Sequence, residues 1–219
     1  MIDLHTHTYV SDGVLGAAEL VSRSRDNGCT AVALTDHADY SNIDLAVSSA
    51  LRSSKTLGRF YGLDVIAGVE LTYIPPADIG PMVKEARALG AEIVVVHGET
   101  PAENVPAGTN EAALKAGCDI LAHPGRITPG ECALAARNRV FLELTTRAGH
   151  RATNRHVAAA ALEHGCRLVL NTDSHAPGDL LDMEKVAGVL RECGLERGLY
   201  DEFLKNSYEI VKSVKERRQ

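Results

Sequence analysis

Residues 27–37 read NGCTAVALTDH and contain every part of a unit that recurs along the chain. Gly28 suits the left-handed backbone position that ends a helix, because glycine has no Cβ to clash there. The apolar run 31–34 has the length and composition of a strand buried on both faces, as parallel sheets require. Polar residues follow at once and include His37. The stretch therefore predicts a helix end, a buried strand and a polar strand end.

The same order of glycine, apolar run and polar residue returns at 89–97, 116–125 and 164–175. Further apolar runs at 2–4, 64–69 and 140–144 bring the number of predicted strands to seven. Strands that alternate with helices indicate an α/β fold, either a closed barrel or an open doubly wound sheet. No GxGxxG or GxxxxGK[ST] motif stands where an open nucleotide-binding sheet needs it. Since barrels carry functional residues at their strand ends, the sequence favours the barrel.

Composition limits the class of protein. The 219 residues, 45% of them hydrophobic, suit one domain spanning 1–219, and with 4% aromatic residues its core should be aliphatic. The formal charge of −6 argues against a basic face for duplex nucleic acid, although bound metal ions can reverse the sign for a small anion. Five cysteines without a CxxC pair are interpreted as buried residues of a reducing compartment. The sequence contains neither a signal peptide nor a membrane-spanning run, so we expect a cytoplasmic protein.

Helical spacing marks the stretches between the strands. One face is shared by Ala17, Leu20, Val21 and Ser24, and another by Met183, Val186, Ala187 and Leu190. A last helix is predicted from Phe203, Ile210, Val211 and Val214, and its basic end, 212–218, is expected to be solvated. The longest loops are expected at 72–80 and 98–110, on the side of the strand ends, where they would serve as lids.

Histidines and carboxylates gather at the predicted strand ends. In His5-Thr6-His7 both imidazoles point to one side, because side chains two apart on an extended segment share a face. Asp12 either joins them or forms a turn or helix cap. The candidate metal ligands are His5, His7, Asp12, His37, Glu70, His97, His123, Asp173 and His175. The remaining histidines, His150, His156 and His164, fall in loops or helices and are interpreted as structural.

This ligand set combines imidazole and carboxylate without thiolate, which suits Zn²⁺, Mn²⁺ or Fe²⁺ rather than a cysteine-rich structural zinc site. The number of ligands exceeds what one catalytic ion uses, so we expect two to three divalent ions that share a bridging carboxylate. Closely spaced ions can hold a bridging hydroxide and stabilise a displacement at phosphorus. Asp3 and Asp36 are expected either to orient the ligand rings or to be structural.

The ordered motifs DLHTHT-x-x-SDG, LTDH, GVE, VVHGE, LAHPGR and NTDSH, between residue 3 and about 180, resemble those of the polymerase and histidinol phosphatase (PHP) superfamily. The resemblance implies a distorted (β/α)7 TIM-like barrel with three metal ions. It places one ion on His5, His7, Glu70 and Asp173, a second on Glu70, His97 and His123, and the third on Asp12, His37 and His175. Some members carry His where this chain has Asp12, so the metal identity stays open. Without an appended second domain, a polymerase module is not expected.

The expected reaction is hydrolysis of a small phosphomonoester, as in histidinol phosphatases, by a hydroxide that the ions hold. Asp173 or a histidine near the third ion, such as His175, would protonate the leaving group. Arg126, Arg147 and Arg151 follow strand ends and are candidates for binding phosphate, because a guanidinium can contact two phosphate oxygens at once.

Three alternatives remain from the sequence. A phosphodiesterase or exonuclease acting on short single strands would need stacking aromatics, and only Tyr9, Tyr40 and Tyr73 lie in the relevant loops. An amidohydrolase-type C–N hydrolase shares the paired histidines and the terminal aspartate, but an eighth strand and a lysine ligand would be expected. A non-catalytic, metal-bound regulatory barrel is disfavoured by the complete ligand set.

Overall fold

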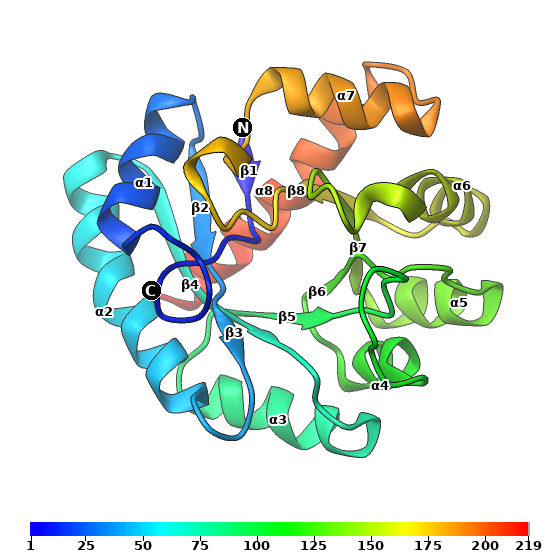
Figure 1. The fold of residues 1–219 in the computed structure, drawn as a ribbon, viewed down its shortest axis with the longest axis horizontal. Helices are drawn as coiled ribbons and strands as arrows, with labels where there is room; N and C mark the ends of the chain where they lie inside the picture. Colours follow the sequence, from blue (N-terminus) through cyan, green and yellow to red (C-terminus); the bar gives the residue numbers. More distant parts are fainter. Residues whose placement is uncertain (219) are drawn as a thin grey trace.

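The computed structural model describes residues 1–218, which form an α/β barrel with its helices on the outside (Figure 1). The strands are β1 (Ile2–Asp3), β2 (Ala31–Leu34), β3 (His37–Ala38), β4 (Asp64–Leu71), β5 (Ile93–His97), β6 (Ile120–Ala122), β7 (Phe141–Thr145) and β8 (Leu168–Asn171). The α-helices are α1 (Ala17–Asp26), α2 (Ile43–Tyr61), α3 (Pro76–Ala88), α4 (Thr109–Ala116), α5 (Pro129–Asn138), α6 (Asn154–His164), α7 (Met183–Cys193) and α8 (Leu199–Arg217). Two 3₁₀ turns, η1 (Arg151–Thr153) and η2 (Pro177–Asp179), precede α6 and α7.

All strand pairs are parallel, and their order around the sheet is β1-β2-β4-β5-β6-β7-β8. The short β3 also pairs with β4 and continues β2 after a break, so it adds no new position. A parallel bridge between Thr6 and Ser174, and the bond from the Asp173 N–H to the His5 carbonyl (2.9 Å), join the two outer strands. The seven predicted strands are therefore confirmed, and the sheet closes into the expected TIM-like barrel.

Alternation along the strands decides what fills the barrel. One buried cluster contains Ile66 of β4, Ile93 and Val95 of β5, Phe141 of β7 and Val169 of β8, so these side chains form its interior. Successive side chains in a strand point to opposite faces. Continuing each strand in steps of two leads from the aliphatic interior to polar residues at the carboxyl end, where β4 reaches Glu70 and β5 reaches His97.

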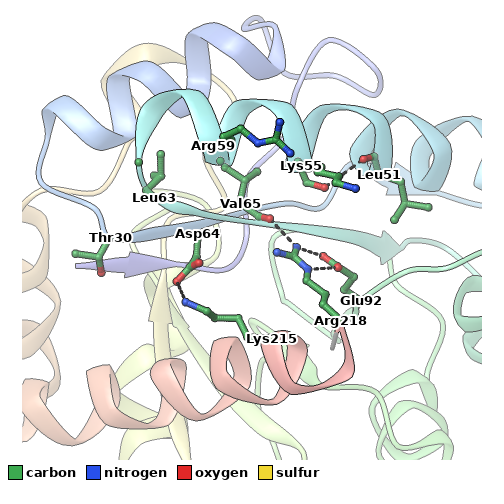
Figure 2. A pocket seen from close by; sticks show the side chains of 13 residues that line it. Thr30, Leu51, Lys55, Arg59, Leu63, Asp64, Val65, Glu92, Lys215 and Arg218 are labelled. Carbon is green, nitrogen blue, oxygen red and sulfur yellow. Dashed lines mark hydrogen bonds and ion pairs between the residues drawn. The ribbon is translucent and has the colours of Figure 1, made fainter.

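Helix α8 closes the opposite, amino-terminal end of the barrel. Its Ile210, Val211 and Val214 belong to the interior cluster and are buried as predicted. The basic end of α8 is not merely solvated, as the sequence had suggested. Lys215 lies 3.0 Å from Asp64, and Arg218 donates to Glu92 at 2.6 Å, which ties the helix to the starts of β4 and β5 (Figure 2).

Beside these ion pairs lies a pocket of about 710 Å³, lined among others by Lys55, Arg59 and Asp64. It lies at the amino end of β4, whereas Glu70 lies at the carboxyl end of the same strand. In parallel barrels the functional side is the carboxyl end of the strands, so this pocket is distinct from the candidate site.

Two details of the sequence prediction were wrong. The loop expected at 72–80 is shorter, because α3 begins at Pro76, and proline is well suited to the first turn of a helix. In α7 the buried face contains Val186, Val189, Leu190 and Cys193, whereas Met183 is exposed. Other details were right: all five cysteines are free and buried, and the core is mainly aliphatic. Within residues 1–218, no helix is both long enough and apolar enough to cross a membrane.

Two glycines provide a matched test of the loop that presents His123. Gly125 and Gly165 have nearly the same left-handed φ, +67° and +69°, but a Cβ on Gly125 would collide with the Glu99 carbonyl, whereas Gly165 has open space. We expect Gly165→Ala to cost about 1 kcal/mol of unfolding free energy. Gly125→Ala should cost a further ~1–3 kcal/mol through overpacking. Urea unfolding of the metal-free proteins measures both, and equal losses would contradict the close approach of the two loops.

Candidate metal centre

The nine predicted ligands lie together at the carboxyl end of the barrel. Seven lie at strand ends or within four residues after them, and Asp12 and His37 reach the same place from a loop and from β3. Burial is graded across the set. The His5 and Glu70 side chains are fully buried, while 25% of the His37 side chain and 56% of the Asp12 side chain are exposed. The centre therefore has a closed inner part and an open outer part.

The inner part is arranged around two carboxylates. Glu70 Oε1 lies 3.3 Å from His5 Nε2, and Glu70 Oε2 lies 3.6 Å from His7 Nε2. Asp173 Oδ1 lies 3.1 Å from His7 Nε2 and 3.7 Å from His5 Nε2. Two imidazoles and two carboxylates thus face one point, which is the ligand chemistry of a divalent transition-metal ion.

A second group shares Glu70. Its Oε1 lies 3.3 Å from His97 Nδ1 and 3.6 Å from His123 Nε2. Because the same carboxylate faces two sets of imidazoles, Glu70 is placed to bridge two ions. The register of the barrel supports this position, since Glu70 stands beside His37 on one side and Val95, two residues before His97, on the other.

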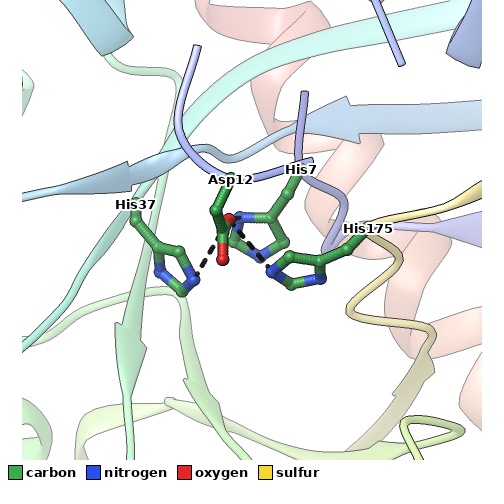
Figure 3. A group of neighbouring side chains, drawn as sticks. All are labelled: His7, Asp12, His37 and His175. Carbon is green, nitrogen blue, oxygen red and sulfur yellow. Dashed lines mark ion pairs between the residues drawn. The ribbon is translucent and has the colours of Figure 1, made fainter. Parts of the chain in front are cut away.

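The third group is the open one and is shown in Figure 3. Asp12 Oδ1 lies 3.1 Å from His175 Nε2 and 3.7 Å from His37 Nε2. His7 completes this group, with its Nδ1 4.0 Å from the same oxygen. The sequence left Asp12 open between a turn residue and a ligand, and its carboxylate lies among the three rings.

Several buried polar atoms of this centre lack a hydrogen-bond partner among the described residues. They include both ring nitrogens of His7, His97 and His123, His5 Nε2, Glu70 Oε1 and Asp173 Oδ1. Buried groups of this kind cost free energy unless they are paired. Divalent cations would satisfy the lone pairs, so the donor set fits metal ions.

The charge states of the two inner carboxylates, Glu70 and Asp173, also fit the binding of metal ions. Burial alone would raise the pKa of Glu70, but the adjacent imidazoles, His5 foremost, hold it well below its usual range. Asp173 is also buried, yet His5 and His7 hold its pKa well below the usual range. Both groups are therefore anions at neutral pH, as ligation by a cation requires.

A layer of side chains beneath the centre fixes the rings, and Glu143 is its main member. Fully buried on β7, Glu143 accepts from His5 Nδ1 at 2.9 Å, from the Asn171 amide at 2.8 Å and from the His123 backbone N–H at 3.2 Å. Because Glu143 occupies the Nδ1 atom of His5, the Nε2 atom of the same ring is free to bind an ion. The sequence analysis missed Glu143, although it shares the inward phase of Phe141 and is the single charge in an apolar run.

The two aspartates proposed as ring-orienting or structural turn out to be structural. The Asp36 carboxylate accepts from the backbone and hydroxyl of both Thr8 and Ser11, and so holds the loop that leads to Asp12. The Asp3 carboxylate accepts from the backbone and hydroxyl of Thr172 at 3.1 and 2.6 Å. Each thus positions the backbone next to a ligand rather than its imidazole.

His150, interpreted from the sequence as structural, differs in position from the exposed His156 because it lies within the centre. Its side chain is buried in the centre, with the ring stacked on His123 at 4.2 Å between centroids. Burial, helped by the His123 ring, lowers the pKa of His150 to about 4, so the imidazole is in its neutral, metal-binding form. A lone histidine in an irregular loop carries no periodic signal that would have identified it.

Glu103, also missed by the sequence analysis, reaches the centre from the loop expected to act as a lid. Its carboxylate lies 3.3 Å from His97 Nε2 and 3.4 Å from His150 Nε2, and it accepts from the Tyr73 hydroxyl at 2.8 Å. The contact with His97 lowers the pKa of Glu103 to about 2. The segment between β5 and α4 therefore covers one side of the metal centre.

The three candidate arginines differ in position. Arg147 lies at the centre, with Nε 3.6 Å from Asp173 Oδ2, and lines a pocket of about 480 Å³ together with Glu103, His150 and Lys185. Arg126 is exposed. Arg151 is exposed as well, and its guanidinium lies 3.5 Å from Glu192 of α7. Of the three, Arg147 is the one that contacts a candidate ligand.

Comparison with known proteins agrees with this geometry. The PHP domain family matches residues 3–176, and the chain belongs to that family. It is 45% identical over 207 residues to the uncharacterized protein MJ1295 of Methanocaldococcus jannaschii, covering 94% of this chain and 93% of that protein.

Two solved structures share the fold at low identity. A chain of archaeal ribonuclease P with mature tRNA superposes with a TM-score of 0.75 at 18% identity, covering 98% of this chain and 91% of that one. A chain described under crystal structures of YwqE from Bacillus subtilis and CpsB from Streptococcus pneumoniae, metal-dependent tyrosine phosphatases, gives a TM-score of 0.63 at 14% identity, covering 97% of this chain and 95% of that one. At such identities these likenesses establish the barrel, and the chemistry must come from the residues.

The shared position of Glu70 gives a prediction about metal content. Purified protein should hold two to three first-row divalent ions per chain, because the ligand count exceeds the four of a typical single zinc site. Glu70→Gln removes an anion that faces two groups and should lower the content by about two ions, whereas Asp12→Ala should remove about one. Elemental analysis after reconstitution measures this. Less than about one ion in the parent, or equal losses in both variants, would contradict the arrangement.

Proposed function

We propose that this protein hydrolyses a small phosphomonoester with the help of two to three divalent ions. The carrying observation is the set of partnerless, buried imidazole and carboxylate atoms directly beside Arg147 and its pocket. When bound, such ions activate water and offset negative charge on phosphoryl oxygens. The membership of the PHP domain family and the phosphatases among the proteins of similar fold support this reaction.

In this proposal the residues of the chain divide the work. The ligand set of nine residues holds the ions, and Glu143 keeps His5 in the tautomer that binds. Arg147 contacts the phosphoryl group, since its side chain is 32% exposed, lines the pocket and faces Asp173. The low pKa of Asp173 makes it a poor proton donor. Of the two candidates we therefore assign protonation of the leaving group to His175 in the two-ion state, in which its Nε2 is not bound to a third ion and its Nδ1 stays engaged with the Asp173 carbonyl at 2.9 Å.

The pocket beside Arg147 suits a compact substrate. Its volume of about 480 Å³ lies within the range typical of small-molecule sites. Lys185, which also lines the pocket, lies 2.6 Å from Asp182 and is 30% exposed. Arg126 and Arg151 remain candidates for more distant parts of the substrate.

The alternatives require features that the described residues offer less clearly. An exonuclease needs a cationic groove with aromatic platforms, and although Tyr9, Tyr40 and Tyr73 are exposed, the Tyr40 hydroxyl is bound to Asp78 and that of Tyr73 to Glu103. A C–N hydrolase of the amidohydrolase type would use a lysine ligand, whereas Lys185, which lines the pocket together with Arg147 and His150, is paired with Asp182 at 2.6 Å. A non-catalytic, metal-bound barrel would keep the same buried ligands, so the pocket that Arg147 lines beside them is what favours an enzyme.

A panel of substrates tests the proposal. We expect Mn²⁺- or Zn²⁺-loaded protein to hydrolyse at least one class of sugar, nucleoside, amino-alcohol or tyrosine phosphomonoester, and chelation to abolish the activity. The panel should include a phosphodiester, single-stranded DNA and RNA, and an N-acyl substrate under the same conditions. Efficient cleavage of one of these with no monoesterase activity would replace the proposal with the matching alternative.

The arginines supply a matched set of variants. Arg147→Ala should lower kcat/KM for the monoester by roughly tenfold to a thousandfold, because a charge-assisted contact to the phosphoryl group is lost. Arg151→Ala should have a smaller effect, since its guanidinium pairs with Glu192. Metal content should stay unchanged in both. Steady-state kinetics that show Arg147→Ala indistinguishable from the parent would remove Arg147 from the binding site.

A further inference from the structure

The strand order determines which loop lies between His123 and Asp173. His123 follows β6 and Asp173 follows β8, and β7 stands between these strands in the sheet. A residue presented by the loop after β7 therefore falls between the two ligands. That residue is His150, whose Nε2 lies 3.7 Å from Asp173 Oδ2 and whose ring stacks on His123.

Asp173 presents its two oxygens to different groups. Oδ1 faces His5 and His7 at 3.7 and 3.1 Å. Oδ2 faces His123 Nε2 at 3.8 Å and His150 Nε2 at 3.7 Å. One ligand atom from each of His123, His150 and Asp173 lies within 4.8 Å of the others, which is compact enough to surround one cation.

We propose that His150 is a metal ligand and that, with His123 and Asp173 Oδ2, it binds a divalent cation on the Arg147 side of the centre. This ion is the second of the two to three on which the proposed function rests, because the neutral His123 imidazole has one lone pair and can bind one ion only. His150 and Asp173 Oδ2 extend the ligand set of that ion beyond Glu70 and His97, and Asp173 becomes a second bridging carboxylate beside Glu70. Both nitrogens of His123 are buried without a hydrogen-bond partner among residues 1–218, so the site has a lone pair to offer.

The surroundings of His150 support a ligand role. Its Nδ1 lies 2.8 Å from the Thr100 hydroxyl, so the outward nitrogen has a partner and Nε2 is left to face the carboxylates. Metal-binding histidines usually engage their second nitrogen in this way. The loop itself is held at its base by Asn154, whose side chain donates to and accepts from the backbone of Thr145 at the end of β7.

Both an anionic and a cationic side chain lie beside the proposed ion position. Glu103 Oε1 lies 3.4 Å from His150 Nε2 and supplies a further anion. Arg147 is the opposing cation, with Nε 3.6 Å from Asp173 Oδ2 and Nη1 3.7 Å from Asp179. A phosphoryl anion lying between Arg147 and the ion bound to His150 would contact both. This ion therefore lies at the edge of the substrate pocket.

Anomalous diffraction from crystals of the wild-type protein grown with Mn²⁺ or Zn²⁺ tests the proposal directly. We expect a metal peak within about 2.0–2.3 Å of His150 Nε2. Metal-loaded crystals with the inner positions filled and no peak bound to His150 would overturn it. This measurement needs no substitution, so it does not depend on how a variant folds.

A matched pair of variants gives an independent measure in solution. His150→Gln should lose about one ion per chain, or bind its last ion at least about tenfold more weakly in a chelator titration. His156→Gln is the control, because that ring is on the exposed side of α6 and contacts the Ile127 carbonyl at 2.8 Å. Wild-type metal content and affinity in His150→Gln would contradict the proposal.

These readouts separate the two ideas. Ions bound to His150 in a protein that hydrolyses no phosphoester would sink the proposed function and keep the ligand assignment. Conversely, a metal-dependent phosphatase in which His150 contacts no ion would keep the function and reject the ligand.

Discussion

The constraint on which the centre depends is the burial of one carboxylate, Glu70, among imidazoles. An isolated buried carboxylate would be protonated or would destabilise the fold. Here the carboxylate oxygens of Glu70 lie 2.6 to 3.6 Å from ring nitrogens of four histidines, which are His5, His37, His97 and His123. Each of these rings comes from a different strand near β4 in the sheet, so the charge of Glu70 is compensated only when these strands are assembled. Fold and ligand geometry are therefore mutually dependent.

Backbone strain at two candidate ligands also links the fold to the geometry of the centre. His123 and Asp173 have positive φ values of 27° and 53°, in a region that residues other than glycine rarely adopt. Such conformations cost free energy and persist only where the surroundings enforce them, which is common at functional sites. The backbone of His123 is held by Glu143, and that of Asp173 by the His5 carbonyl across the closing seam. The strain is thus borne by the layer beneath the ions and by barrel closure.

Much of the barrel and of the ligand set could be predicted from the sequence, because a recurring pattern marks the strands and their polar ends. Glycine followed by an apolar run marked four of the seven strands, and the polar residue that ends the run marked the ligand, as at His97 and His123. The parts that failed lack a periodic signal. His150 and Glu103 reach the centre from irregular loops, and their positions depend on contacts with Thr100 and Tyr73 that are distant in sequence. Glu143 is different, because its inward phase was readable and only its purpose was not.

The charge of the site is the reason why we propose a small anion rather than a long one as its substrate. Asp12, Glu70, Glu103, Glu143 and Asp173 carry five formal negative charges, and three divalent ions carry six positive ones, so filling all three positions reverses the sign of the centre. Beyond the ions the attraction is limited, because the chain has a net charge of −6 and Arg147 is the candidate arginine that contacts the centre. A polyanion would extend past the ions onto an acidic surface and gain few phosphate contacts there. A single phosphoryl group, in contrast, interacts only with the ions and Arg147, where the positive charge is concentrated.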